Sequence, residues 1–333
     1  MYVFMYICSL ERDLASRKLQ LQENEKLLGI MAFGDSILDT GNNNNLISLI
    51  KCNFPPYGQD FIGGKPTGRF CNGKVLTDLI AEGLGVKETV PAYFDPNLQS
   101  KDLATGVCFA SGGAGLDPLT SSITSVIPIS EQLENFREYI RKLEGLVGEE
   151  GANKIISNSL FLLLIKYDIS TYTSMLVSWT STIIKDLYEV GVRKIAIFST
   201  LPLGCLPILR TLHGGLMRSC GDDDNKAAEL FNSKLLAEMK NLSSFLPQAK
   251  IVYVDIYNPL LDLINNPVKS GFSVPDRSCC GTGTIETSVL CNQLIPFTCD
   301  NVSEFVFWDS AHPSEKAYMI IASPILQDLK KNF

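Results

Sequence analysis

The hydrophobic residues of this chain alternate between short continuous runs and longer stretches with helical spacing. Each run is flanked by glycine or polar residues and is typical of a strand buried on both faces of a parallel sheet. The predicted strands are residues 30–33, 107–110, 160–165, 194–199 and 251–256. The predicted helices are residues 74–84, 130–146, 148–157, 171–190, 222–242 and 312–329. This order predicts a doubly wound α/β fold with a five-stranded parallel sheet.

Two of the predicted strands end in sequences that could form part of a site. The first strand runs into Gly34-Asp35-Ser36, and residues 107–110 run into Ser111-Gly112-Gly113. Ligands bind beside the carboxyl ends of the strands in an open parallel sheet, so a serine there can present its hydroxyl to a crevice. Glycines allow the backbone to approach a ligand closely. Both sequences are also ordinary turn chemistry, so neither defines a site alone.

The C-terminal part of the chain offers a base for that serine. Asp309 and His312 are three residues apart, and His312 is one of only two histidines in the chain. A serine hydroxyl is a weak nucleophile that needs a base, usually a histidine held by a carboxylate. In a turn or a first helical turn, this spacing lets the carboxylate reach the imidazole. Ser36, His312 and Asp309 together therefore indicate a catalytic triad.

These two regions also carry a resemblance to a known family. Phe33-Gly34-Asp35-Ser36-Ile37 and Trp308-Asp309-Ser310-Ala311-His312-Pro313 closely resemble the first and last blocks of the plant GDSL esterase/lipases, a branch of the SGNH hydrolases. Further matching blocks follow in the family's order: Phe109-Ala110-Ser111-Gly112-Gly113-Ala114-Gly115, Leu201-Pro202-Leu203-Gly204-Cys205, Asp255-Ile256-Tyr257-Asn258-Pro259 and Cys279-Cys280-Gly281-Thr282-Gly283. The resemblance covers residues 29–333 as a single domain and leaves residues 1–28 as an extension. It implies the SGNH hydrolase fold, a flavodoxin-like three-layer sandwich.

The resemblance also implies a mechanism on acyl esters. Ser36 would attack the ester carbonyl, His312 would carry the proton, and Asp309 would orient the ring. The family's oxyanion hole uses the nucleophile's N–H, a glycine N–H of the second block and an asparagine side chain. The first donor corresponds to Ser36 and the second to Gly113, with Gly112 as the neighbouring alternative. The second block departs from the family at Cys108, where the family usually has asparagine.

The third block departs further. In the family, a strand like residues 160–165 runs directly into Gly-x-Asn-Asp, whereas this chain continues with Lys166-Tyr167-Asp168. The simplest interpretation is a deletion at the junction of residues 165 and 166, which removes the asparagine donor. Asp168 is no substitute because a carboxylate repels an oxyanion. Lys166 or Tyr167 could donate there, but each is expected to be a solvated loop residue, and His213 a surface histidine.

Composition limits the partners. The formal charge of −7 argues against nucleic acid or an anionic membrane, and no apolar segment reaches the ~18 residues of a membrane span. Ten cysteines favour disulfides over zinc, since Cys279 and Cys280 are adjacent and no histidine is near, but the pairing stays open. The expected chemistry requires no metal and no organic cofactor. The expected partner is a small-molecule or lipid ester.

The resemblance implies a secreted protein, but the N-terminus does not fit a signal peptide. Residues 1–10 are apolar without a basic start, and residues 11–28 are charged, as in a helix or a disordered arm. A misassigned first exon or an intracellular product would explain this. Asn241 and Asn301 lie in glycosylation acceptor sequences.

Two functions remain: a serine esterase or lipase, impaired by the missing asparagine, and a catalytically inactive homologue that binds lipid or cell-wall esters.

Overall fold

The centre of the molecule is a parallel sheet of four strands. The computed structural model describes residues 26–164, 173–294 and 297–333, so most of the predicted N-terminal extension lies outside it. The strands lie in the order β1-β2-β3-β4 and comprise β1 (Ile30–Gly34), β2 (Leu160–Leu164), β3 (Lys194–Phe198) and β4 (Lys250–Val254). Gly34 pairs with Leu164 at the carboxyl ends of β1 and β2. The predicted α/β class with a parallel sheet is confirmed.

One of the five predicted strands, residues 107–110, is reduced to an isolated bridge. Cys108 pairs in parallel with Ala32 of β1 and, on its other side, with Ala92. Gly106 has φ of +94°, and the carbonyl of Ala32 accepts hydrogen bonds from both Phe109 and Ala110, so a regular ladder does not form. The segment still lies outside β1, which gives the flavodoxin-like order of crossovers.

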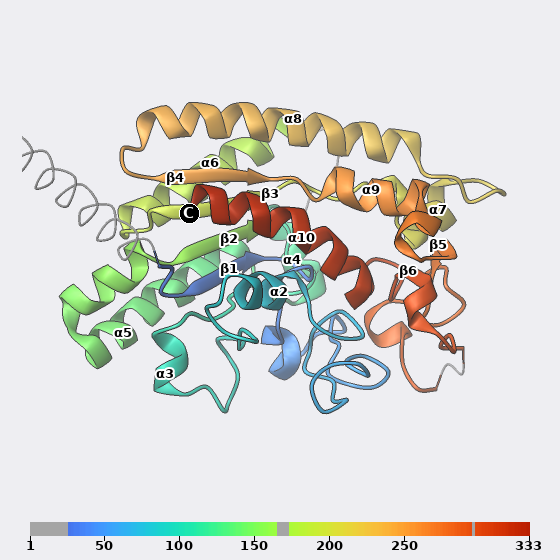
Figure 1. The fold of residues 1–333 in the computed structure, drawn as a ribbon, viewed down its shortest axis with the longest axis horizontal. Coiled ribbons are helices and arrows are strands. Elements are labelled where there is room, and N and C mark those ends of the chain that lie inside the picture. Colours follow the sequence, from blue (N-terminus) through green and yellow to red (C-terminus); the bar gives the residue numbers. More distant parts are fainter. Residues whose placement is uncertain (1–25, 165–172, 295–296) are drawn as a thin grey trace, which may run out of the picture.

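Helices cover both faces of the sheet because alternate residues of each strand point to opposite sides. In β1, Ile30 and Ala32 face a core that is completed by helices α2, α9 and α10. Met31 and Phe33 face a second core that is completed by α5, α6 and α8. In Figure 1, α10 crosses in front of the strands while α8 runs along one side of the sheet. The arrangement is therefore a three-layer sandwich.

The observed helices follow most of the predicted ones. Their bounds are α2 (Leu76–Gly83), α3 (Ser100–Leu103), α4 (Pro118–Thr124), α5 (Ile129–Ser157), α6 (Thr173–Glu189), α7 (Pro207–His213), α8 (Asp222–Phe245), α9 (Tyr257–Asn265) and α10 (Glu315–Asn332). Gly148 has φ of +77° inside α5, which divides it where two helices were predicted. The prediction that His312 begins the last helix was wrong. The N–H of Trp308 donates to the carbonyl of His312 in a tight turn, and Ser314 caps α10.

A second, small sheet was not predicted. It pairs β5 (Val274–Ser278) with β6 (Phe305–Phe307) in parallel, and it lies beside α7 and the start of α10 (Figure 1). The sequence of β5 lacks the apolar alternation that signals a strand. Disulfides Cys279–Cys299 and Cys280–Cys291 close the loops that follow β5. With Cys205–Cys220, they confirm the predicted disulfides and supply the pairing that the sequence left open.

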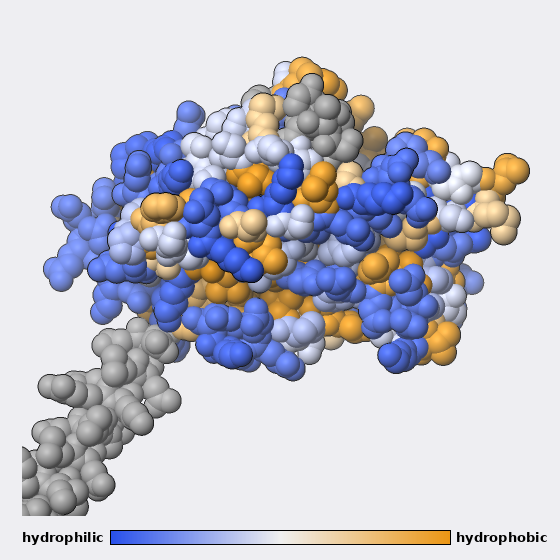
Figure 2. All heavy atoms as spheres, turned by 90° about the horizontal axis from the view of Figure 1, so that it is seen from above, coloured by the Kyte–Doolittle hydropathy of each residue, from blue (hydrophilic) through white to orange (hydrophobic). Residues whose placement is uncertain are grey.

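The surface carries few extended apolar areas on the side of α8. Figure 2 shows that side, where hydrophilic residues cover most of the face and apolar residues are exposed in small groups. Within the described ranges, none of the helices combines the length and the apolar character that a membrane crossing requires.

Candidate active site

The end of β1 is shaped by a glycine that no other residue can replace. Gly34 has φ of +135°, and a Cβ there would lie 1.9 Å from the carbonyl oxygen of Leu164. The buried amide of Gln132 accepts from the N–H of Gly34 at 2.9 Å and donates to its carbonyl at 2.9 Å. The chain therefore leaves the sheet in one fixed direction and presents Ser36 at the carboxyl end of β1.

Ser36, His312 and Asp309 form a continuous line of hydrogen bonds. The Nε2 atom of His312 lies 2.7 Å from Ser36 Oγ, and its Nδ1 atom lies 2.7 Å from Asp309 Oδ1. Asp309 is fully buried, and its Oδ1 also accepts from the backbone N–H groups of Ala311 and His312 at 2.9 Å. Because a carboxylate oxygen can only accept here, the Nδ1 atom of His312 carries the proton and Nε2 faces the serine.

The second oxygen of Asp309 is held by two hydroxyl groups that sequence reasoning missed. Tyr57 Oη donates to Asp309 Oδ2 at 2.6 Å, and Thr287 Oγ1 donates to the same atom at 3.0 Å. The N–H of Ser288 donates to Tyr57 Oη at 2.7 Å, which directs the phenol proton at Asp309. Burial and the nearby Asp309 carboxylate raise the pKa of Tyr57, so it stays a neutral donor. The proline- and glycine-bounded sequence Pro55-Pro56-Tyr57-Gly58 was the available signal.

We expect Tyr57→Phe to lower kcat by ~10-fold, with little change in KM, for the ester hydrolysis that the sequence resemblance implies, since hydrogen bonds to charged groups are worth about 1.5–3 kcal/mol and Thr287 still holds Asp309. Tyr139→Phe is the matched control because Tyr139 is equally buried but donates to the carbonyl of Leu103, away from the triad. Steady-state kinetics of both variants test this. Equal losses of kcat in the two variants would show a general effect of removing a buried hydroxyl.

The ring of Phe70 packs against both His312 and the second block, residues 109–115. Its ring centroid lies 5.1 Å from that of His312, and a Cβ on Gly112 would lie 2.2 Å from the ring. The N–H of Gly112 donates to Asp39 Oδ2 at 2.8 Å, so it is not available to an oxyanion. Gly113 has φ of +83°, and its N–H has no hydrogen-bond partner among the described residues. Of the two glycines, Gly113 therefore stays the predicted donor.

The acidic and asparagine-rich segment after Ser36 anchors the second block. Asp39 Oδ1 accepts from the N–H groups of Gly41 and Asn42, while the amide of Asn42 donates to the carbonyls of Cys108 and Ala110 at 2.9 and 2.8 Å. Burial raises the pKa of Asp39 to about 6, against the lowering effect of these N–H donors. Burial also raises the pKa of Cys108 to about 12, so its thiol is neutral.

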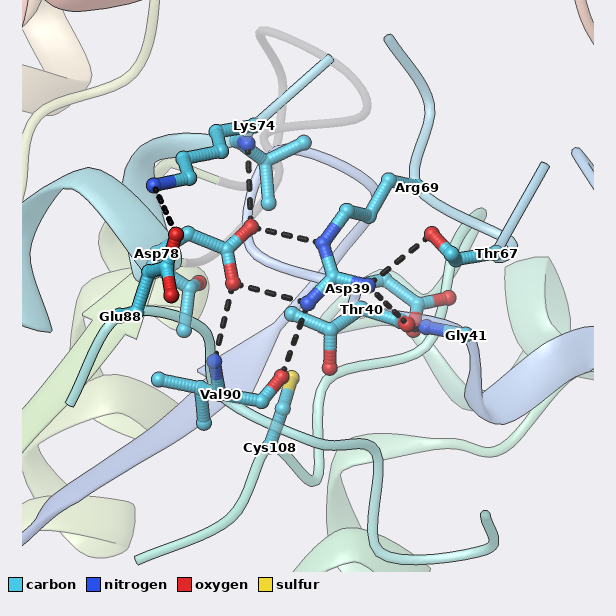
Figure 3. Close-up of polar contacts among 12 residues, drawn as sticks. Asp39, Thr40, Gly41, Thr67, Arg69, Lys74, Asp78, Glu88, Val90 and Cys108 are labelled. Atoms are coloured by element: carbon cyan, nitrogen blue, oxygen red, sulfur yellow. Dashed lines mark hydrogen bonds and ion pairs between the residues drawn. The ribbon is translucent and has the colours of Figure 1, made fainter. Parts of the chain in front are cut away.

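A buried ion pair fixes the loops around this anchor (Figure 3). The guanidinium of Arg69 donates to both oxygens of Asp78 at 2.7 and 2.8 Å, and it also donates to Thr40, Thr67 and Val90. Every N–H of the guanidinium therefore has a partner. The pair connects the segment that follows Ser36 to the start of α2. It therefore helps to hold the loops beside Ser36 in place.

We expect Arg69→Met to lower the free energy of unfolding by about 3–5 kcal/mol, because it leaves the buried Asp78 carboxylate without its counter-charge. Lys74→Met is the control, since Lys74 pairs with the half-exposed Glu82 at 2.9 Å and such pairs contribute only ~0–1 kcal/mol. Urea unfolding of both variants measures the difference. A similar small loss in both would show that the Arg69–Asp78 pair is not essential to the fold.

Ser36 and His312 line a cavity of about 560 Å³. Its walls are mostly aliphatic, and further polar groups come from Asp35, Thr200, His213, Asp223, Asp224 and Thr287. His213 is half exposed and lies in this cavity, bonded to Asp224 at 2.8 Å. Lys166, Tyr167, Asp168 and the predicted deletion at 165–166 lie outside the described residues. Within the described ranges, no group of three histidine, cysteine or acidic residues could hold a metal ion.

Comparison with known proteins gives a family for most of the chain. The sequence model of the GDSL-like Lipase/Acylhydrolase family matches residues 30–325. GDSL esterase/lipase EXL3 of Arabidopsis thaliana is 48% identical over 91% of this chain and 88% of its own length. GDSL esterase/lipase At1g23500 of the same plant is 52% identical over 91% of this chain and 89% of its own length.

Proposed function

Because this chain belongs to the GDSL-like lipase/acylhydrolase family, a family of carboxylic ester hydrolases, we propose that Ser36, His312 and Asp309 perform that hydrolysis as a triad. The observation that carries the proposal is the unbroken line of hydrogen bonds from Ser36 Oγ through the His312 ring to Asp309. The hydroxyl and the imidazole also open into one cavity, where a small-molecule or lipid ester can reach both.

In this mechanism, Ser36 Oγ attacks the carbonyl carbon while its proton moves to His312 Nε2. The proposed oxyanion hole is the N–H groups of Ser36 and Gly113, which would donate hydrogen bonds to the oxygen that becomes negative. The bond to the alcohol breaks as Nε2 gives its proton to the departing oxygen, which leaves an acyl group on Ser36. Water attacks this acyl group with its proton passing to Nε2, and the acid is released when Ser36 regains the proton.

The oxyanion hole is proposed to lack one donor, the asparagine of the third block. The alignment with EXL3 spans 320 residues, whereas 91% of the 333 residues of this chain is fewer than 320. This chain therefore has fewer residues than EXL3 across the aligned region, which supports a deletion. The cavity is lined by Leu164, the last residue of β2, so a donor after this strand would be close to the ester. Removal of one such donor leaves residual catalysis, and this favours a slow enzyme.

The second candidate is a catalytically inactive homologue that keeps the cavity and binds an ester ligand. The departure from the family after residue 165 favours it. A p-nitrophenyl ester series of increasing acyl length separates the two, because a slow esterase turns over at least one member with saturation kinetics. We expect turnover that is lost in Ser36→Ala. Binding of the esters without turnover above that of Ser36→Ala would establish the inactive homologue.

We also propose that the protein is secreted. Three disulfides, Cys205–Cys220, Cys279–Cys299 and Cys280–Cys291, support this because such bonds persist in oxidising compartments. Both glycosylation acceptors, Asn241 and Asn301, are exposed. Intact-mass measurement before and after reduction checks this on protein that was purified from the medium of expressing cells. Free thiols at these six cysteines in such protein would contradict it.

A further inference from the structure

The cavity that opens at Ser36 and His312 is also lined by a second histidine–carboxylate pair. Ser36 and His312 form one part of its lining, and His213 and Asp224 form another. Much of the remaining wall is aliphatic, from Leu203, Leu206, Ile208, Leu209 and Ala227. An aliphatic wall suits a methylene chain, whereas a histidine beside a carboxylate suits a polar group. The cavity therefore offers a polar contact that the hydrolysis itself does not use.

The His213–Asp224 pair leaves one ring nitrogen for a ligand. His213 Nδ1 lies 2.8 Å from Asp224 Oδ2, and a carboxylate oxygen only accepts, so Nδ1 carries a proton. His213 Nε2 has no hydrogen-bond partner among the described residues. In the neutral ring this nitrogen is an acceptor, which selects a ligand group that donates, such as a hydroxyl.

The pair is held by a braced segment of the chain. His213 ends α7 and Asp224 lies in the first turn of α8, while disulfide Cys205–Cys220 joins the segments that carry them. The guanidinium of Arg210 donates to the carbonyls of Cys205 and Arg218 at 2.9 and 3.0 Å. These contacts brace the segment that carries His213 and Asp224, and a contact that is arranged before the ligand arrives lowers the cost of binding.

We propose that His213 accepts a hydrogen bond from a hydroxyl on the acyl chain of the substrate, remote from the ester, and that Asp224 positions the His213 ring. The substrate class is then an ester of a hydroxylated fatty acid. The carbonyl lies at Ser36, the methylenes lie along the aliphatic wall, and the hydroxyl reaches His213 Nε2. This inference rests on the proposed function, since it places the ester at Ser36.

The test uses p-nitrophenyl esters of linear acids, each chain length prepared with a methyl, a hydroxyl or a methoxy end. The assays are run at pH ~8.5 to favour the neutral imidazole. The wild type is then expected to prefer the hydroxyl end ~2–10-fold in kcat/KM at one range of chain lengths. The methoxy end cannot donate and gains nothing. His213→Phe removes the preference, and Asp224→Ala reduces it.

Leu212→Ala is the matched control, because Leu212 is on the same helix but is 63% exposed and does not line the cavity. It is expected to keep the preference for the hydroxyl end. The same preference in the wild type and His213→Phe would overturn the inference, as would an equal gain from the methoxy end. Calorimetry of the corresponding methyl esters binding to Ser36→Ala compares the affinities for the hydroxyl, methoxy and methyl ends without turnover. A failure of hydrolysis is therefore distinguishable from a failure of hydroxyl recognition.

Discussion

Replacement of Ser36 by alanine is expected to lower kcat for ester hydrolysis by ~10⁴-fold or more, because removal of the nucleophile eliminates the acyl-enzyme route. His312→Ala should cost nearly as much, since His312 is the only base that the described residues place within hydrogen-bond reach of Ser36 Oγ. The two losses should not add in the double variant, because the pair acts as one unit. Steady-state kinetics on a p-nitrophenyl ester measure all three variants.

Ser310→Ala is the matched control for this series. Ser310 lies next to Asp309 and is fully buried, but its Oγ atom has no hydrogen-bond partner among the described residues. It should keep kcat within a few-fold of the wild type. A Ser36→Ala variant that retains most of its activity would remove Ser36 from the mechanism, and a comparable loss in Ser310→Ala would point to damage of the fold.

Restoration of the third block is expected to give the second-largest effect. Insertion of the family's Gly-x-Asn-Asp segment between Ile165 and Lys166 should raise kcat ~10²–10³-fold, the usual contribution of one oxyanion donor. KM should change far less, because the donor acts chiefly in the transition state.

The matched control carries the same insertion with alanine in place of the asparagine. It should leave kcat close to that of the unaltered protein, since it restores the chain length without the donor. If the unaltered protein already matches an intact relative in the same assay, the hole is complete without the insertion. Lys166 or Tyr167 would then be the first groups to examine as donors.

The elements that could be predicted from the sequence are those that depend on a local pattern of residues. Strands β1 to β4 were recognisable because each is a compact apolar run, and the division of α5 was recognisable from Gly148. Residues 107–110 looked like a fifth strand, but their pairing depends on Gly106 and on partners far along the chain. The β5–β6 sheet escaped prediction because disulfides define its surroundings more than hydrophobic alternation does.

The site residues that lie in local motifs could also be predicted, whereas those that depend on contacts distant in sequence could not. Ser36, Asp309 and His312 lie in short motifs, and the fold brings them within hydrogen-bond distance as the motifs suggested. Tyr57 and Thr287 could not be assigned, because their contact with Asp309 crosses 252 and 22 residues of sequence. The prediction that His213 is a surface histidine agrees with its half-exposed side chain, but only the folded chain shows that it also lines the cavity of Ser36.

Covalent labelling with a fluorophosphonate, followed by peptide mass spectrometry, tests the assignment of Ser36 most directly, because it reports the activated serine even if ester turnover is slow. We predict one adduct on the peptide that contains Ser36, no adduct in Ser36→Ala, and labelling abolished in His312→Ala. An adduct that survives Ser36→Ala, or a wild-type protein that stays unlabelled while an intact relative reacts, would contradict the proposed triad.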